Sequence, residues 1–219
     1  MVTAATDQVR FDVHDGAATI QLNRAEKRNA VSRDMWIAMT AQLRAAADDP
    51  KVRALVVSGL PGVFCAGADL ASVKHADAAV AAEYQQIALA AFAALRDFPR
   101  PTLAAIDGLC IGGGCNIALA CDVRIAGPQA SFAIPAVRHG IVYDEWTIRR
   151  LVELVGSGRA AHFLFTAQRI GAERAAAIGL VDLHVDDLAA ATASYLADLM
   201  MGDDTAIAGI RASIHRAAQ

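Results

Sequence analysis

The sequence predicts a single-domain α/β fold, and three observations support this prediction. Short apolar runs alternate with longer stretches of helical spacing in the order β–α–β–α–β–α–β, which is typical of strands joined by crossover helices. The run VRALVVS at residues 52–58 is apolar almost throughout, as expected for a strand covered on both faces. No linker-like segment or internal repeat divides the 219 residues, a length that suits one well-buried core.

Each element follows from a local pattern. The Asp-Gly pair at residues 15–16 separates two short apolar runs and predicts a hairpin turn. Met35, Met39 and Leu43 recur at helical spacing, and Ser32 can cap the helix that they predict. In chain order, the predicted strands are 9–13, 17–22, 52–58, 103–106, 123–126 and 181–185, and the predicted helices are 32–47, 78–96, a helix from the glycine run 112–114 to residue 121, 145–155, 160–165, 172–178 and 186–200.

Composition argues against several classes of protein. Hydrophobic residues make up 55% of the chain and charged residues 20%, so a disordered chain is not expected. The net charge is −3 without a long basic block, which argues against non-specific nucleic-acid binding. We find neither a secretory signal nor an apolar run long enough to span a bilayer. The expectation is therefore a soluble, cytoplasmic protein with no membrane span.

Metal binding is not expected from the cysteines or histidines. Cys65, Cys110, Cys115 and Cys121 form no Cys-x-x-Cys pair, and the six histidines contain no pair four residues apart. Buried free thiols are the simpler interpretation of such cysteines.

Two glycine-rich loops each follow a predicted buried strand, at residues 66–69 (AGAD) and 112–114 (GGG). Glycine lets the backbone approach a ligand closely. The second loop opens a helix, whose free N–H groups favour negative charge. Two such donors that converge on one carbonyl oxygen form an oxyanion hole. Each loop taken alone is also compatible with a simple tight turn.

Five segments resemble the enoyl-CoA hydratase/isomerase (crotonase) superfamily. In order they are LNRAEKRNAVS, DDPKVRALVVSG, VFCAGADL, IGGGCNIALACDVRIA and AERAAAIGLVD, within about residues 9–200. The resemblance implies a crotonase-like ββα-spiral core over residues 1–200, a homotrimer or hexamer, and a bound acyl-CoA whose coenzyme A belongs to the ligand, with no separate cofactor. Residues 201–219 would be a C-terminal helical segment, shorter than the terminal helices of that family.

The resemblance also assigns functional residues. It implies that the oxyanion donors are the backbone N–H groups of Ala68 and Gly113. It places the adenine and phosphates of coenzyme A near the following residues: Arg24, Lys27, Arg28, Ala66, Asp69 and Leu70. Arginine suits phosphate because its donors form a fork, although each of these charges could also be part of a solvated run.

Both glutamates that the resembled hydratases use are absent. Their positions hold Asn116 and Ala136, and neither side chain can take up a proton. Losing a positioned acid or base costs on the order of a hundred- to ten-thousand-fold in rate. The favoured hypothesis is therefore an acyl-CoA-binding protein of lipid metabolism that presents its ligand to a fatty-acid-synthesis enzyme, without efficient hydratase activity.

Asp144 keeps an enzymatic alternative open. It lies where the resembled dienoyl-CoA isomerases carry a catalytic aspartate, so an isomerase or lyase with Asp144 as acid/base is the second hypothesis. The residue could instead cap the helix that begins near Glu145. Tyr143 and Trp146 are expected to shape an acyl pocket or to fill the core. The run GIVYDEWTIRRLVELVGSGRA resembles mycobacterial members of the superfamily that lack both glutamates.

Overall fold

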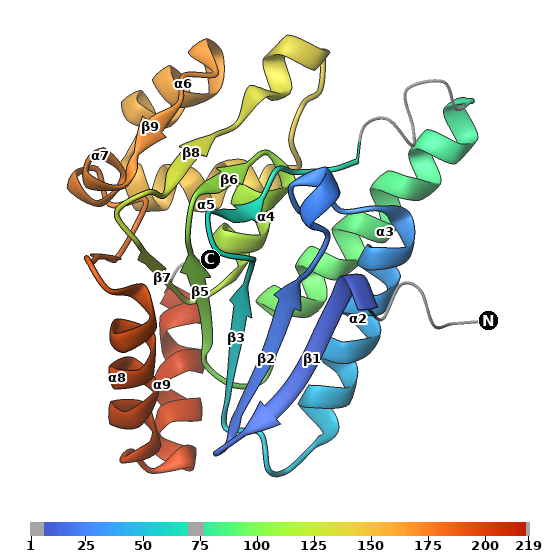
Figure 1. Cartoon of the computed structure of the whole chain (residues 1–219). Helices are drawn as coiled ribbons and strands as arrows, with labels where there is room; N and C mark the ends of the chain where they lie inside the picture. Colours follow the sequence, from blue (N-terminus) through green and yellow to red (C-terminus); the bar gives the residue numbers. More distant parts are fainter. Residues whose placement is uncertain (1–6, 70–76, 218–219) are drawn as a thin grey trace.

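Two β-sheets form the centre of the protein in a computed structural model, which describes residues 7–69 and 77–217 (Figure 1). Within those ranges the larger sheet runs β1-β2-β3-β5-β7-β10, and all its pairs are parallel except β1–β2. Its strands are β1 Val9–His14, β2 Ala17–Leu22, β3 Ala54–Ser58, β5 Thr102–Ile106, β7 Val123–Ala126 and β10 Leu183–His184. The smaller sheet, in the order β4-β6-β8-β9, consists of β4 Val63–Cys65, β6 Leu109–Ile111, β8 Ser131–Ala133 and β9 Ile170–Gly171.

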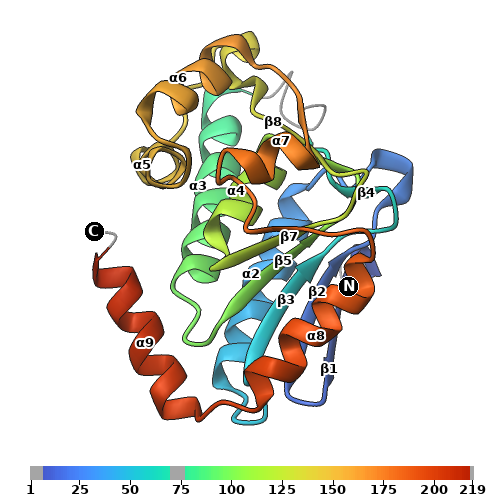
Figure 2. The same ribbon diagram turned by 90° about the vertical axis from the view of Figure 1, so that its left-hand side faces the viewer.

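Helices cover both faces of the larger sheet (Figure 2). On one face Leu55, Val57 and Ala104 belong to the main core, together with α2, α3 and α4. On the other face Val56 and Leu103 pack against α8. Since both faces are buried, the strands are apolar almost throughout. The helical segments are η1 Ala25–Lys27, α2 Arg33–Asp48, α3 Ala78–Arg96, α4 Gly113–Ala120, η3 Pro135–His139, α5 Glu145–Val155, α6 Ser157–Thr166, α7 Ala172–Ala177, α8 Leu188–Met200 and α9 Asp204–Ala217.

Most predicted elements of the larger sheet and its helices are confirmed. The hairpin turn has positive φ at both Asp15 and Gly16, as a two-residue type I′ turn requires. Helix α2 begins after Ser32, whose hydroxyl accepts a hydrogen bond from the Met35 amide at 3.3 Å. The four cysteines are buried and unpaired, as predicted.

The smaller sheet was not predicted. Three of its strands have only three residues each, which is too short for an alternating pattern to be recognised. The predicted strand 181–185 is also wrong in extent, because the residues paired with β7 are only Leu183 and His184.

Helix α3 corrects the expectation about apolar runs. Its 19 residues have a hydropathy of 1.3, so in length and composition it meets the criterion for a bilayer-crossing helix. The same criterion is met by core helices of globular domains. Tyr84, Ala88, Ala91 and Leu95 of this helix pack into the main core, and 28% of its apolar window is buried, so a single helix of this kind is weak evidence for a membrane span.

Candidate functional site

The two segments that the sequence assigned to a ligand are fastened to each other. The Ala66 amide donates to the Arg28 carbonyl at 3.0 Å, and the Val31 amide donates to the Gly67 carbonyl at 2.8 Å. The Asp69 amide in turn donates to the Val31 carbonyl at 3.0 Å. These bonds fix the position of Ala68, whose amide is a predicted oxyanion donor.

Asn29 ties the segment around Arg24 to β4, and the sequence did not predict this role. Its backbone is left-handed, with φ 54°, and it is fully buried. Its side-chain amide donates to the carbonyls of Val63 and Phe64, and its Oδ1 accepts from the Arg24 amide at 2.8 Å. Asparagine tolerates such a backbone and bonds locally to the main chain, so the Arg-Asn pair at residues 28–29 could have identified this turn.

The amides of Ala68 and Gly113 lie side by side. A Cβ built on Gly113 would lie 3.4 Å from the Ala68 nitrogen. Gly113 is the first residue of α4, so its N–H has no acceptor within the helix. No backbone acceptor for the Ala68 N–H is found in the described ranges. Gly67 permits this approach, because its φ is +100° and a Cβ there would lie 2.9 Å from the Ile111 carbonyl oxygen.

Ala68 and Gly113 both line a cavity of about 340 Å³ between α2, α3, α4, η3 and the turn before α5. Asn116 and Ala136 also line this cavity and are only 6% and 8% exposed. The Asn116 Oδ1 is buried and has no hydrogen-bond partner. A buried acceptor without a partner is unusual in proteins, so this oxygen can accept a hydrogen bond from a group bound in the cavity. His139, which follows Ala136 by one turn of η3, lines the same cavity and was not predicted.

Asp144 is the one carboxylate among the described residues that line this cavity. It is also the N-cap of α5. Its Oδ1 accepts from the Thr147 amide at 3.0 Å and its Oδ2 from the Thr147 hydroxyl at 2.7 Å. The capping role that the sequence left open is therefore confirmed, and a catalytic role for the same carboxylate stays a prediction. A carboxylate has about four acceptor positions, so capping leaves Asp144 able to contact a ligand.

A hydrogen-bonded pair of aromatic residues fixes the wall of the cavity to the glycine loop. The Trp36 indole donates to the Tyr84 hydroxyl at 3.1 Å, and that hydroxyl donates to the Val31 carbonyl at 2.6 Å. Burial raises the pKa of Tyr84 to about 12, so the hydroxyl stays protonated and keeps its bond. Tyr84 thus joins α2 and α3 to Val31, which pairs with Ala68 in the glycine loop.

The residues predicted to hold coenzyme A differ in their surroundings. Arg24 forms an ion pair with Asp69 at 2.8 Å and donates to the Ala30 carbonyl at 3.0 Å, so its side chain is engaged inside the protein. Lys27 and Arg28 are exposed. Among the other members of this group, Ala66 lines the cavity, and Leu70 lies outside the described residues.

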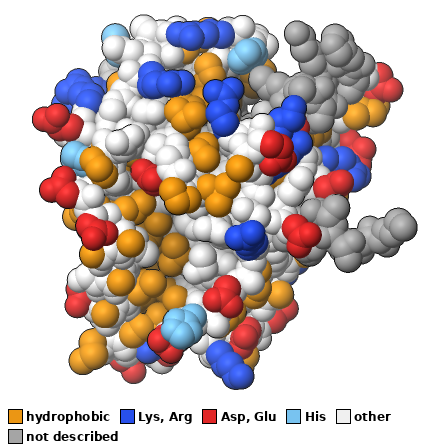
Figure 3. All heavy atoms as spheres, viewed as in Figure 1, with side chains coloured by type: hydrophobic (Ala, Val, Ile, Leu, Met, Phe, Trp, Pro, Cys, Tyr) orange, Lys and Arg blue, Asp and Glu red, His pale blue; other side chains and the backbone are white. Residues whose placement is uncertain are grey.

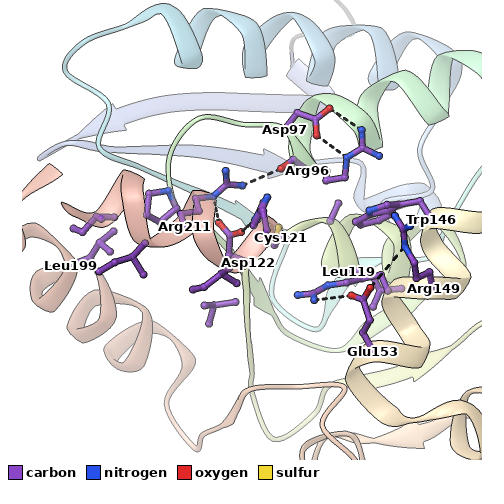
Figure 4. Close-up of a pocket in the computed structure, with 18 of the residues that line it drawn as sticks. Arg96, Asp97, Leu119, Cys121, Asp122, Trp146, Arg149, Glu153, Leu199 and Arg211 are labelled. Atoms are coloured by element: carbon purple, nitrogen blue, oxygen red, sulfur yellow. Dashed lines mark hydrogen bonds and ion pairs between the residues drawn. The ribbon is translucent and has the colours of Figure 1, made fainter. Parts of the chain in front are cut away.

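Tyr143 lines the cavity of about 340 Å³, but Trp146 does not. Trp146 borders a second cavity of about 660 Å³ between α4, α5, α8 and α9 (Figure 4). The Arg96 guanidinium lies 5.4 Å from the centre of the Trp146 ring system, a distance typical of a cation–π contact. On the opposite side of this second cavity, the Asp122 carboxylate binds Arg211 and His215 of α9, each at 2.7 Å.

No three His, Cys, Asp or Glu side chains gather into a potential metal site in residues 7–69 and 77–217.

Comparison with known sequences gives a consistent result. The profile described as enoyl-CoA hydratase/isomerase matches residues 12–219. The Mycobacterium tuberculosis protein named "Probable enoyl-CoA hydratase echA6" is 38% identical over 168 residues, which is 77% of this chain and 67% of that protein. A crotonyl-CoA hydratase of Syntrophomonas wolfei is 34% identical over 179 residues, covering 81% of this chain and 69% of that enzyme.

Solved structures agree over nearly the whole chain. The Pseudomonas aeruginosa protein DspI is 35% identical and covers 97% of this chain and 88% of its own, with a TM-score of 0.91. An enoyl-CoA hydratase of Bacillus anthracis, 26% identical, covers 95% of this chain and 82% of its own with a TM-score of 0.91. The predicted crotonase fold is confirmed by these matches.

Proposed function

The chain belongs to the enoyl-CoA hydratase/isomerase family, and we propose that it binds fatty acyl-CoA thioesters without hydrating them efficiently. The family implies an acyl-CoA ligand. One observation carries the finer proposal. The cavity combines the adjacent backbone amides of Ala68 and Gly113 with the side chains of Asn116 and Ala136, at the positions where a hydratase would need its two carboxylates.

The amides of Ala68 and Gly113 supply the binding half of this proposal. Both would donate to the thioester carbonyl oxygen, and the dipole of α4 favours negative charge at the same point. Gly113 lies at the first position of that helix. The carbonyl carbon would then face Asn116, one helical turn further along α4.

Asn116 and Ala136 limit the chemistry. The Asn116 amide can hold a water molecule through its unpaired oxygen, yet it cannot accept the proton that activation of water releases. Ala136 offers no polar group at all. A thioester bound here would therefore be polarised without being hydrated, which suits a protein that holds an acyl-CoA for another enzyme.

Titration with hexanoyl-CoA, with crotonyl-CoA hydration measured on the same sample, tests this proposal. We expect binding with a rise in melting temperature, because a ligand at a hundred times its Kd stabilises the native state by about 2.7 kcal/mol. Free coenzyme A is the control for the nucleotide end, and we expect a smaller rise with it. Absence of any rise with hexanoyl-CoA, or rapid hydration of crotonyl-CoA, would contradict the proposal.

Asp144 supports a second candidate function, an acyl-CoA isomerase or lyase that uses this carboxylate as acid or base. The supporting observation is that Asp144 lines the same cavity as the two amides. A dienoyl-CoA isomerisation assay on the wild type and on Asp144→Asn distinguishes the two functions. Turnover that disappears in the variant would favour the enzyme. Because the amide can still accept from Thr147, the cap of α5 should survive, and circular dichroism checks this.

A further inference from the structure

Tyr143 lies directly beside the glycine loop that carries one of the two amide donors. It precedes Asp144, the N-cap of α5, lines the first cavity and packs against the main core. A Cβ built on Gly112 would lie 3.6 Å from the Tyr143 hydroxyl oxygen. Since Gly112 immediately precedes Gly113, the hydroxyl lies at the N-terminus of α4, where the free amides are.

The hydroxyl of Tyr143 has no hydrogen-bond partner in the described part of the chain, whereas that of Tyr84 accepts one bond and donates another. Tyrosine hydroxyls in protein interiors usually find a partner. The hydroxyl is not among the unpartnered polar atoms that are sealed from solvent, which include the Asn116 Oδ1. The hydroxyl oxygen therefore keeps some solvent exposure, and since Tyr143 lines the cavity, a ligand there can reach it.

The state of the phenol suits a donor. Burial raises the pKa of Tyr143 well above its ordinary value, and the nearby Cys115 and Asp144 act in the same direction. The hydroxyl is therefore protonated at any physiological pH. A fixed donor in a partly enclosed protein site stabilises a partly negative oxygen more strongly than the same donor in water.

We propose that the Tyr143 hydroxyl is a third hydrogen-bond donor to the thioester carbonyl oxygen, beside the backbone amides of Ala68 and Gly113. This inference rests on the proposed function, since it concerns the same bound thioester. It implies that the cavity selects ligands by their carbonyl group as well as by their acyl chain. It also gives the site a side-chain donor that can be removed without disturbing the backbone.

Tyr143→Phe removes the hydroxyl while leaving the ring in the core, so it is the direct test. Two probes are compared: hexanoyl-CoA labelled with ¹³C at the carbonyl, and the thioether S-hexyl-CoA, which has no carbonyl. In the variant we expect affinity for hexanoyl-CoA to fall about five- to tenfold, the usual effect of one hydrogen bond, and affinity for S-hexyl-CoA to stay the same. The ¹³C signal of the bound carbonyl should return part of the way to its position in free hexanoyl-CoA.

Tyr195→Phe is the matched control, because Tyr195 is another largely buried tyrosine but borders only the second cavity. It should change neither affinity nor the ¹³C signal. An unchanged carbonyl signal in Tyr143→Phe, or an equal loss of affinity for both probes, would overturn the inference and leave Tyr143 a packing residue. If the wild type bound neither probe, the proposed function would fail first, and this inference with it.

Discussion

In the proposed function, Asn116 holds a position that limits what chemistry the cavity can perform. It lies in the first turn of α4, three residues after the Gly113 donor, and side chains in a helix lean toward its N-terminus. Its amide therefore lies over the place where a bound thioester would present the carbons next to its carbonyl. Position 116 lacks a proton acceptor because its side chain is an amide and not a carboxylate.

Restoring both carboxylates should therefore restore hydration. We expect Asn116→Glu combined with Ala136→Glu to raise the rate of crotonyl-CoA hydration at least about a hundredfold over the wild type, because positioned acid–base groups contribute that much or more. The measurement is loss of the enoyl thioester absorbance. The control is the pair Asn116→Gln and Ala136→Gln, which matches the size of glutamate but cannot take up a proton. An equal gain in the control would refute the explanation.

The basic residues near the cavity should separate into one that stabilises the fold and two that bind ligand. Arg24 is paired with Asp69, so Arg24→Ala should lower the free energy of unfolding by about 3 kcal/mol, the lower end of the cost of breaking a buried ion pair. Lys27 and Arg28 are exposed. Replacing both with Ala should change stability by less than about 0.5 kcal/mol but weaken hexanoyl-CoA binding about three- to tenfold.

Urea unfolding and calorimetric titration of the two variants check this separation. The weakening in the Lys27→Ala/Arg28→Ala variant should shrink at high salt, because exposed charges are screened there. Unchanged affinity at low salt would remove these two residues from the coenzyme A site.

At the scale of elements, the sequence predicted what depends on local pattern and missed what depends on distant pairing. Helices α3 and α5 begin and end where predicted, because capping aspartates and helical spacing mark them. The strands β4 and β6 were missed, since each gains its register from a partner far along the chain. Ala68 and Gly113 were assigned from family motifs, and their approach depends on this small sheet.

The same limit explains why the different surroundings of Tyr143 and Trp146 were not predicted. The two residues are three positions apart, and the sequence predicted that both shape an acyl pocket or fill the core; both pack against the main core. The N-cap at Asp144 lies between them, so the chain turns into α5 and Trp146 points to the second cavity instead. Without the cap geometry and the position of α9, no sequence pattern could distinguish the two environments.

Helix α9 is held to the rest of the protein by a cluster of charged groups, with consequences for stability at low pH. Asp122 accepts from the Thr102 amide and binds Arg211 and His215. Burial alone would raise the pKa of Asp122, but the bonds from Arg211 and His215 outweigh it and lower that pKa below its usual value. The stabilisation from this carboxylate is therefore present above its unfolded pKa of about 3.9 and is lost as the pH falls below it.

Asp122→Asn should accordingly reduce the free energy of unfolding by about 3 kcal/mol at pH 7, and the difference from the wild type should narrow as the pH falls below about 4. Urea unfolding at pH 7 and pH 3 measures both values. Asp12→Asn, on the exposed side of β1, is the control and should have little effect at either pH. A difference that stays constant with pH would show that the charge of Asp122 is not what matters.

For the whole molecule, α9 leaves apolar side chains exposed along the second cavity. No residue of this helix is buried, and Ile210 and Ile214, one turn apart, border the second cavity and are 61% and 60% exposed. Figure 2 shows α9 standing away from the strands, and Figure 3 shows hydrophobic side chains over α8 and α9 at the lower left. Apolar groups gathered in this way are typical of surfaces that bind another protein.

We therefore expect copies of this chain to associate through α9, as a trimer or hexamer. Ile210→Asp combined with Ile214→Asp places two charges in such an interface and should yield monomers, because unpaired charges there are costly to bury. Light scattering after size exclusion gives the mass of each form. Met201→Asp is the control, since Met201 is 88% exposed but lies in the turn before α9. The Asp122 cluster uses Arg211 and His215, so the variant should keep its fold and melting temperature. A wild type that is already monomeric would contradict the expectation, and the face of α9 would then need another partner.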